Sequence, residues 1–201
     1  VRRENNRVVL KLADLSTKET KEVSCHIVVG ADGATSSVAA ALNANELPPQ
    51  HGCVAVRAYM ENVENLSDAI EIHFMDEIIP GYFWIFPLGE GKANVGVGMV
   101  LSEMHKKHLN LVHVLENIMQ HSRFSSRFAH AKIESPIQGW TLPFGSHKRK
   151  IAHANALLLG DAAALIDPFT GEGIGNALVS AQLASETILS ALEKEDFSEA
   201  F

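Results

Sequence analysis

The stretch from Asn155 to Ile174 constrains the fold more than any other part of this sequence. It opens with an apolar run, 155–159, that is typical of a buried strand in a parallel sheet. Three turn-forming segments follow, at Gly160-Asp161, Asp167-Pro168 and Gly171-Glu-Gly173. Apolar residues then recur with helical spacing over 173–193. The sequence therefore predicts a strand, a glycine-rich turn and a long helix, which together form a unit of α/β folds.

This unit predicts a ligand site. Asp161 comes directly after the carboxyl end of the strand, where open α/β sheets bind their ligands. Gly171 and Gly173 let the backbone approach a ligand, and the following helix offers free N–H groups and a partial positive charge. Each glycine taken alone is also explained by turn geometry. The concentration of these features within one segment favours the ligand site.

Composition excludes several other classes of function. The chain has 201 residues, 17 Lys plus Arg, 24 Asp plus Glu and a formal charge of -7, so phosphate-driven nucleic-acid binding is not expected. Its two cysteines, Cys25 and Cys53, form neither a disulfide framework nor a CxxC pair, which predicts a reducing, cytoplasmic compartment. The sequence has ten histidines but no HExxH pattern, so no metal site is predicted. No apolar run is long enough to span a bilayer.

The remaining chain divides into segments of different periodicity. Strands are expected at 7–12 and 25–29, a short helix at 36–42 and a linker at 43–52. Four strands in close succession (54–60, 70–74, 82–86 and 93–99), a helix at 103–121 and a strand at 133–142 predict a mostly antiparallel sheet with a covering helix. The expected fold is α/β (α+β), with one domain, 1–48 and 143–201, interrupted by another, 49–142.

An aromatic stripe lies within the second domain. Tyr82, Trp84 and Phe86 alternate along one expected strand and so project from one of its faces, with Pro87 next in the chain. Such a stripe is either packed against the core helix or lines a cavity for an apolar ligand. From the residues alone the packed face is the commoner outcome.

Three motifs together resemble a known family. Gly160-Asp161 with Pro168-Phe-Thr-Gly-Glu-Gly-Ile174 is similar to the second flavin motif of the p-hydroxybenzoate hydroxylase-like FAD oxidoreductases, and its wording is closest to the geranylgeranyl reductase branch. Val29-Gly-Ala-Asp-Gly-Ala-Thr-Ser-Ser-Val38 resembles their Asp-Gly motif. Pro80-Gly-Tyr-Phe-Trp-Ile-Phe-Pro87 resembles the reductases' Tyr-x-Trp-x-Phe-Pro signature.

The resemblance implies a role for each motif. Asp161 would bind the ribitol of FAD, while Gly173 and Ile174 would lie against the flavin ring. The implied cofactor-binding residues are Asp32, Gly33, Gly160, Asp161, Pro168, Gly171, Gly173 and Ile174, and the implied substrate residues are Tyr82, Trp84, Phe86 and Pro87. The family usually has an arginine where this chain has Ala39. This difference weakens the expectation that the motif contacts a pyridine nucleotide, but it does not change the expected fold. From the residues alone, Asp32 and Thr35 also suit a turn with a helix cap.

The function implied is FAD-dependent reduction of carbon–carbon double bonds in an isoprenoid-like apolar substrate, with NAD(P)H or another electron donor. The family's N-terminal GxGxxG is missing, so Val1 is expected to lie inside a longer polypeptide and the chain alone is expected to be inactive and to need that segment to bind FAD. A lipid substrate is compatible with peripheral membrane contact. The residues identify no catalytic acid or base, and no oligomeric state.

Two alternatives stay open at this point. A flavin monooxygenase that hydroxylates or epoxidises an apolar substrate fits the motifs at Asp32 and Asp161 equally well. A non-catalytic fragment that only binds an apolar ligand or a partner chain predicts no flavin uptake, and a cavity between the sheet and the helix at 103–121. A flavin-dependent halogenase is disfavoured because its Trp-x-Trp-x-Ile-Pro signature is absent.

Overall fold

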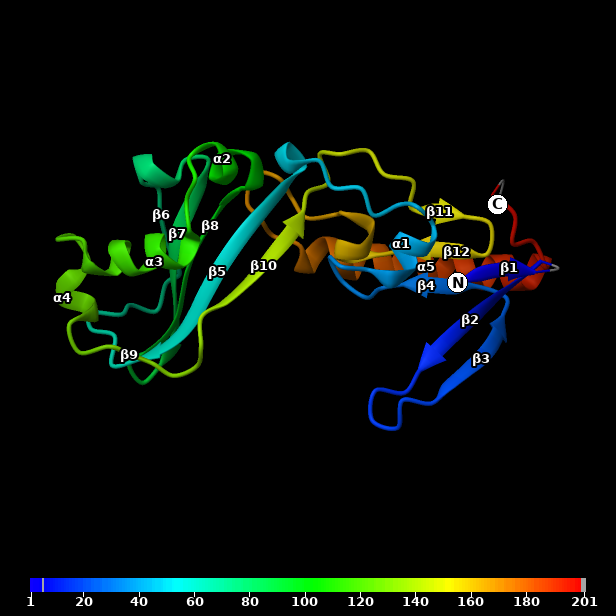
Figure 1. Cartoon of the computed structure of the whole chain (residues 1–201), viewed down its shortest axis with the longest axis horizontal. Coiled ribbons are helices and arrows are strands. Elements are labelled where there is room, and N and C mark those ends of the chain that lie inside the picture. Colours follow the sequence, from blue (N-terminus) through cyan, green and yellow to red (C-terminus); the bar gives the residue numbers. More distant parts are fainter. Residues whose placement is uncertain (5, 200–201) are drawn as a thin grey trace. The chain divides into compact units, whose positions relative to one another are not determined.

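The structure is a computed structural model that describes residues 1–4 and 6–199 (Figure 1). The chain folds into two compact units. Unit 1 comprises Val1–Pro48 and Pro143–Phe201, and unit 2 comprises Pro49–Leu142. Within the described residues, no helix is long and apolar enough to cross a membrane.

Unit 1 contains two three-stranded sheets and the longest helix (Figure 1). Its elements are β1 (Arg2–Glu4), β2 (Arg7–Ala13), β3 (Thr20–Cys25), β4 (Val28–Gly30), α1 (Ser37–Ala41), β11 (Ala152–His153), β12 (Ala156–Leu158), the 3-10 helix η3 (Gly160–Ala163) and α5 (Ile174–Lys194). Strands β1, β2 and β3 pair antiparallel. The second sheet has the order β11-β12-β4, and β12 runs parallel to β4 with Leu158 opposite Gly30.

Gly30 permits the tight packing beneath this parallel pair. A β-carbon at residue 30 would lie 2.7 Å from Cδ2 of Leu158 and 2.9 Å from Cβ of Val38. Because Gly30 has no β-carbon, α1 packs closely on the sheet. Ala39 of α1 and Leu158 of β12 share a buried cluster with Ala163 of η3. The turns that leave β4 and β12 are thereby held at the same edge of the sheet.

Unit 2 is a sheet with helices on one face. Its elements are the 3-10 helices η1 (Pro49–His51) and η2 (Asp76–Ile78), the strands β5 (Gly52–Glu61), β6 (Glu71–His73), β7 (Gly81–Gly89), β8 (Lys92–Val100), β9 (Lys132–Ile133) and β10 (Gln138–Pro143), and the helices α2 (Leu101–Lys106), α3 (Leu111–Gln120) and α4 (Ser125–Phe128). The strand order is β10-β5-β8-β7-β6, with β9 also paired to β5. The pairs β5–β8, β8–β7 and β7–β6 are antiparallel.

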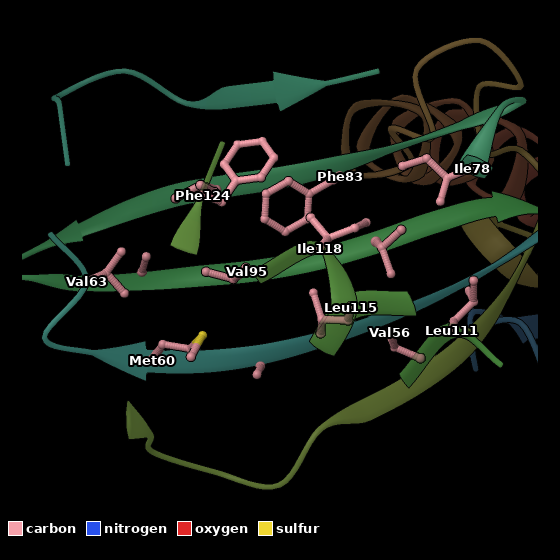
Figure 2. Packing of buried hydrophobic residues seen from close by; sticks show 14 of the residues in the cluster. Val56, Met60, Val63, Ile78, Phe83, Val95, Leu111, Leu115, Ile118 and Phe124 are labelled. Atoms are coloured by element: carbon pink, nitrogen blue, oxygen red, sulfur yellow. The ribbon is translucent and has the colours of Figure 1, made fainter. Parts of the chain in front are cut away.

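The core of unit 2 lies between one face of this sheet and α3. Every second residue of β5, β7 and β8 points to this face, as strand geometry requires. Phe83 and Val95 are completely buried there, and Leu115 and Ile118 of α3 pack onto them (Figure 2). The space between α3 and the sheet is therefore filled by side chains, where the ligand-binding alternative predicts a cavity.

Three expected elements are each divided in two. The helix expected at 103–121 becomes α2 and α3, because His108 adopts a left-handed conformation with φ 52° and the side chain of Asn110 caps α3 through Val112 N at 2.9 Å. The strand expected at 133–142 becomes β9 and β10, separated by a segment with Pro136, which lacks the N–H that a ladder needs. The strand expected at 25–29 becomes β3 and β4, which belong to different sheets.

Candidate functional site

The strand–turn–helix unit of the sequence forms as one piece of unit 1. After β12 the chain turns at Gly160, whose φ of 52° is in the left-handed region that favours glycine. A β-carbon at residue 160 would lie 3.1 Å from Cβ of Ala177 in α5. The N–H of Gly160 donates to Oγ of Ser180 at 3.1 Å, and this hydroxyl donates to the carbonyl of Ala177 at 2.8 Å. The turn after β12 is thus fixed against the first turns of α5.

The carboxylate of Asp161 points to the start of α5. A β-carbon built on Gly173, the residue that precedes α5, would lie 3.3 Å from Oδ1 of Asp161 and 2.9 Å from Cγ1 of Ile166. No group of the described residues donates a hydrogen bond to this carboxylate. Partial burial raises the pKa of Asp161. A half-buried acceptor without a partner beside a helix N-terminus is suited to hydroxyl groups of a ligand.

The loop between η3 and α5 is organised by Asp167. Oδ1 of Asp167 accepts hydrogen bonds from the N–H of Phe169 at 3.1 Å and from the N–H and hydroxyl of Thr170 at 2.7 and 2.8 Å. These bonds lower the pKa of Asp167. The carboxylate of Glu172 accepts from the N–H of Gly175 at 2.8 Å and so caps α5. The roles of Asp167 in the loop and of Glu172 at the helix start were not predicted from the sequence. An Asp that is followed two and three residues later by backbone N–H donors is nevertheless a local signal for a turn.

Three predicted cofactor residues lie on this loop and the helix start. Gly171 has a left-handed φ of 76°, and Pro168 is exposed. Ile174, the first residue of α5, leaves 77% of its surface exposed, and the neighbouring Phe169 leaves 92% exposed. Both side chains therefore present apolar surface to the surroundings. Their part in binding a cofactor stays a prediction.

Asp32 and Gly33 follow β4 as Asp161 follows β12. Because β4 and β12 are parallel neighbours, the two aspartates lie beyond the carboxyl ends of adjacent strands, at one edge of the sheet. Gly33 has a φ of 79°, and no atom lies within 4 Å of a β-carbon built there. The structure therefore brings the two predicted motifs together.

The Asp32 carboxylate serves a structural purpose at this edge. It accepts hydrogen bonds from the hydroxyl of Ser36 at 2.5 Å and from the N–H of Ser37 at 2.7 Å, while Oγ of Ser36 caps α1 through Ala39 N at 2.8 Å. Partial burial acts to raise the pKa of Asp32, but the hydrogen bonds from Ser36 and from backbone N–H groups outweigh it and the pKa is lowered. The turn and helix cap recognised as an alternative from sequence are thus present, with Ser36 rather than Thr35 as the N-cap residue beside Asp32, whereas a cofactor contact of Asp32 stays a prediction.

The aromatic stripe of unit 2 lies on the sheet face opposite the packed core. Tyr82, Trp84 and Phe86 are all partly exposed, whereas the alternate residues Phe83 and Ile85 are completely buried under α3. The ring centres of Tyr82 and Trp84 are 6.0 Å apart, as are those of Trp84 and Phe86. The stripe is therefore not the face packed against the core helix, which the residues alone favoured.

The same face carries glycines that make room for the rings. Trp84 pairs with Gly96 and Tyr82 with Gly98 in β8. A β-carbon at residue 96 would overlap the indole of Trp84, so the ring lies over the backbone of β8 at Gly96. Nε1 of Trp84 donates to Oδ1 of Asn94 at 2.8 Å. Pro87 follows the stripe and is partly exposed. These contacts hold the aromatic face in place without burying it.

A groove lies in unit 1. A groove of about 550 Å³ between β12 and α5 is lined mostly by apolar side chains, including Leu157, Val179 and Leu183. Asp167, Pro168 and Asn176 also line it, while Asp161 and Gly173 do not. Within the described residues no group of His, Cys, Asp and Glu side chains is arranged to hold a metal ion.

Comparisons with known proteins agree with this geometry. The family model of the geranylgeranyl reductase catalytic domain matches residues 52–136, which include the aromatic stripe. Digeranylgeranylglycerophospholipid reductase 2 of Methanopyrus kandleri is 34% identical over 184 residues, which cover 90% of this chain and 46% of that protein.

Solved structures show the same fold. A geranylgeranyl bacteriochlorophyll reductase-like protein from Thermoplasma acidophilum superposes with a TM-score of 0.85 at 29% identity, covering 98% of this chain and 48% of that one. The halogenase PltM, solved in complex with phloroglucinol and FAD, superposes with a TM-score of 0.76 at 12% identity, covering 99% of this chain and 43% of that one. A likeness this distant shows the fold alone.

The fold class is that of the FAD-binding flavoprotein oxidoreductases. Within this class, the chain belongs to the geranylgeranyl reductase family. The chain spans about half the length of the relatives that it matches, 46% of the Methanopyrus kandleri protein and 48% of the Thermoplasma acidophilum protein.

Proposed function

We propose that this chain is part of an FAD-dependent oxidoreductase that reduces carbon–carbon double bonds in an isoprenoid-like apolar substrate. The observation that carries the proposal is the unpartnered, half-buried carboxylate of Asp161 against Gly173 at the start of α5. The names of the relatives, which are reductases of geranylgeranyl compounds, support the substrate class.

The residues around α5 fit FAD in their chemistry. Asp161 is the acceptor for ribitol hydroxyls, since its carboxylate lacks a donor among the described residues. Gly173 lets the start of α5 lie close to Asp161 and Ile166, Gly171 gives the preceding loop its left-handed turn, and Ile174 offers an exposed apolar contact. The partial positive charge of the helix N-terminus stabilises negative charge at the edge of such a ring. Bound FAD supplies the two-electron redox chemistry that side chains lack.

The aromatic face of unit 2 is the proposed substrate surface. Tyr82, Trp84 and Phe86 form an apolar face that remains partly exposed and is held rigid by the pairing of β7 with β8. Rigid aromatic rings order a flexible chain at little entropic cost to the protein. The role of these residues is to bind and orient the double bond and to exclude water from it. No residue of this face is proposed as a catalytic acid or base, and the contribution proposed for the face is orientation.

The test begins with cofactor binding. FAD is added to the 201-residue chain, and to a longer form that carries an N-terminal GxGxxG strand–helix unit, and flavin absorbance is recorded after gel filtration. The flavin-loaded protein is then reduced without oxygen and given a prenyl substrate. A product that has gained two hydrogen atoms per double bond supports the proposal. A product that contains an oxygen atom and forms only with oxygen consumption identifies a monooxygenase instead. If neither form binds FAD, the proposal is contradicted, and the alternative of a non-catalytic fragment that only binds an apolar ligand or a partner chain is favoured.

Membrane contact and the electron donor belong to the same proposal. We infer that the donor is NAD(P)H or another electron donor, and that a lipid substrate brings the protein to a membrane surface peripherally. Flotation with vesicles that contain the prenyl lipid tests the second point, because a protein that stays at the bottom of the gradient with and without the lipid makes no such contact.

A further inference from the structure

The side chain of Arg149 joins two parts of unit 1 that are far apart in the sequence. Its Nη1 donates to the carbonyl of Ala162 at 3.2 Å, and its Nη2 donates to the carbonyl of Glu46 at 2.6 Å. Ala162 directly follows Asp161 in η3, and Glu46 lies in the segment that follows α1. Arg149 belongs to the segment through which the chain returns to unit 1, so one guanidinium connects three segments.

The guanidinium makes these contacts without a carboxylate partner. Within the residues that the structure describes, Arg149 forms no ion pair, and its buried Nε has no acceptor. Burial lowers the pKa of Arg149, and no carboxylate offsets this effect. A partly buried charge costs free energy unless it is paired or hydrogen-bonded. The hydrogen bonds to the two carbonyls, which a charged donor makes about twice as strong as neutral ones, are therefore what holds the guanidinium in place.

The turn that carries Asp161 is short and depends on outside contacts. The carbonyl of Gly160 accepts from the N–H of Leu165 at 3.1 Å. The carbonyl of Asp161 accepts from the N–H of Ala164 at 3.0 Å, while the carbonyl of Ala162 is bound by the guanidinium. Ala164 ends η3 with a left-handed φ of 55°, which is unfavourable for a residue other than glycine and persists only where surrounding contacts maintain it.

Small side chains form the junction between the same two segments. One buried cluster contains Ala39, Ala44, Leu158 and Ala163. Ala44 precedes Glu46 by two residues, and Ala163 directly follows Ala162. Alanine methyl groups let the segments lie close together, but each buries little area and so fixes their relative position only weakly. The charge-assisted hydrogen bonds of Arg149 act across this junction and define its geometry.

The position of the Asp161 carboxylate follows from its backbone. No group of the described residues donates a hydrogen bond to this carboxylate. The residues on both sides of it are held instead, Gly160 through its N–H by the hydroxyl of Ser180 at 3.1 Å, and Ala162 through its carbonyl by Arg149. Burial raises the pKa of Asp161, and no charged neighbour among the described residues contributes to this shift. Arg149 thus bears on the carboxylate through the backbone and not through its charge.

We propose that Arg149 is a positioning residue of the cofactor site, which holds the turn after β12 against the segment that follows α1 and so places the carboxylate of Asp161 opposite Gly173. The inference rests on the proposed function, because it gives Arg149 a part in the affinity for FAD. It also adds to the site a residue that lies outside both of the flavin-like motifs, 29–38 and 160–174.

The titration of Asp161 tests the positioning role without a flavin. Carbon-13 NMR of the 201-residue chain follows the carboxyl group of Asp161 with pH, and D161N assigns its signal. In R149M the turn is expected to relax and the carboxylate to gain water, so the pKa of Asp161 falls toward the ordinary value of an aspartate. If the positive charge of Arg149 acted directly on the carboxylate, its removal would raise this pKa. A raised or unchanged pKa of Asp161 in folded R149M therefore overturns the inference.

Two further variants separate positioning from a general loss of structure. K148M removes a positive charge from the neighbouring, exposed residue and is expected to leave the pKa of Asp161 unchanged. R149K keeps the charge, but its compact ammonium does not match two carbonyls as the planar guanidinium does, so an intermediate pKa of Asp161 is expected. The melting temperature of each variant shows whether it is folded. If R149M does not fold, R149K decides in its place, and a wild-type pKa of Asp161 in R149K then overturns the inference.

FAD binding separates this inference from the proposed function. In the longer form that carries the GxGxxG unit, R149M is expected to bind FAD about tenfold more weakly than the wild type, and K148M as the wild type does. If the wild type and R149M bind FAD equally, the cofactor role of Arg149 is overturned while the proposed function stands. If the longer wild-type form binds no FAD, the proposed function and the cofactor role of Arg149 are overturned together, and the titration still decides whether Arg149 positions Asp161.

Discussion

The carboxylate of Asp161 and the α-carbon of Gly173 face each other across the turn that joins β12 to α5. A β-carbon at residue 173 would come within 3.3 Å of Oδ1 of Asp161, which is closer than most such contacts. The pair therefore sets how near the carboxylate lies to the positive end of the helix. It also means that the smallest side chain added at Gly173 disturbs the predicted cofactor site and the packing of Ile166 together.

Replacing Gly173 by alanine tests this proximity. The added carbon would lie 2.9 Å from Cγ1 of Ile166, and overpacking of this kind costs about 1–3 kcal/mol in the free energy of unfolding. We expect G173A to unfold at lower urea concentration and, in a flavin-binding form, to bind FAD at least about tenfold more weakly. G175A is the matched control, because its β-carbon meets only the flexible Glu172 side chain at 3.4 Å. In the helix it is expected to raise stability by about 0.5–1 kcal/mol. Equal effects of the two changes would contradict the proposed crowding.

The raised pKa of Asp161 predicts a stability that falls as the pH rises. Since burial raises the pKa of Asp161 in the folded protein, the folded state holds this proton to a higher pH than the unfolded state does. Ionisation therefore destabilises the fold, starting near the unfolded value of about pH 4 and complete above the folded pKa. We expect D161N to melt at a higher temperature than the wild type at pH 7, with the difference shrinking toward pH 4, and to bind FAD more weakly. A lower melting temperature of D161N at pH 7 would show that the carboxylate stabilises the folded chain.

The neighbouring carboxylate at Asp32 predicts the opposite pH dependence. Its pKa is lowered because hydrogen bonds from Ser36 and from backbone N–H groups outweigh the effect of burial, so the folded state binds this proton less readily. The stability that Asp32 contributes is present above about pH 4 and lost as the pH falls through its folded pKa. D32A is expected to cost about 1–2 kcal/mol at pH 7, as the loss of a helix cap does. Chemical denaturation at several pH values measures this.

A double substitution shows whether Asp32 and Ser36 act together. Ser36 both donates to Asp32 and caps α1, so S36A removes part of what D32A removes. The loss in D32A/S36A is expected to be smaller than the sum of the two single losses. Additive losses would mean that the two side chains stabilise α1 independently.

The strand–turn–helix of unit 1 was predictable because each of its parts has a local signal. The apolar run before Gly160 became β12, and the expected helix at 173–193 became α5 at Ile174–Lys194. The aspartates at positions 32 and 161 could be placed at one sheet edge once their strands were expected to be parallel. The division of the helix expected at 103–121 escaped prediction because the left-handed conformation of His108 has no strong signal in the sequence, whereas Pro136 is a visible signal against one continuous strand at 133–142.

The role of each sheet face in unit 2 could not be predicted from alternation alone. Every residue of β7 from Tyr82 to Phe86 is aromatic or aliphatic. The alternation of side chains along the strand therefore does not identify which of the two alternating sets of residues faces the core. The decision is made by α3, whose apolar face packs on Phe83 and Ile85, and by Gly96, which accommodates the indole of Trp84.

Substitutions at two adjacent aromatic residues of β7 are expected to affect stability and substrate binding differently. Phe83 is completely buried in the core, whereas Trp84 lies on the opposite, partly exposed face. F83A is expected to lower the free energy of unfolding by about 3–5 kcal/mol, because it leaves a cavity. W84F loses the hydrogen bond to Asn94 and part of the indole, so it should cost no more than about 1.5 kcal/mol and yet weaken farnesol binding several-fold. Urea unfolding and titration calorimetry measure the two quantities independently. A W84F variant that is destabilised as strongly as F83A while binding farnesol unchanged would make Trp84 a core residue and remove it from the proposed substrate face.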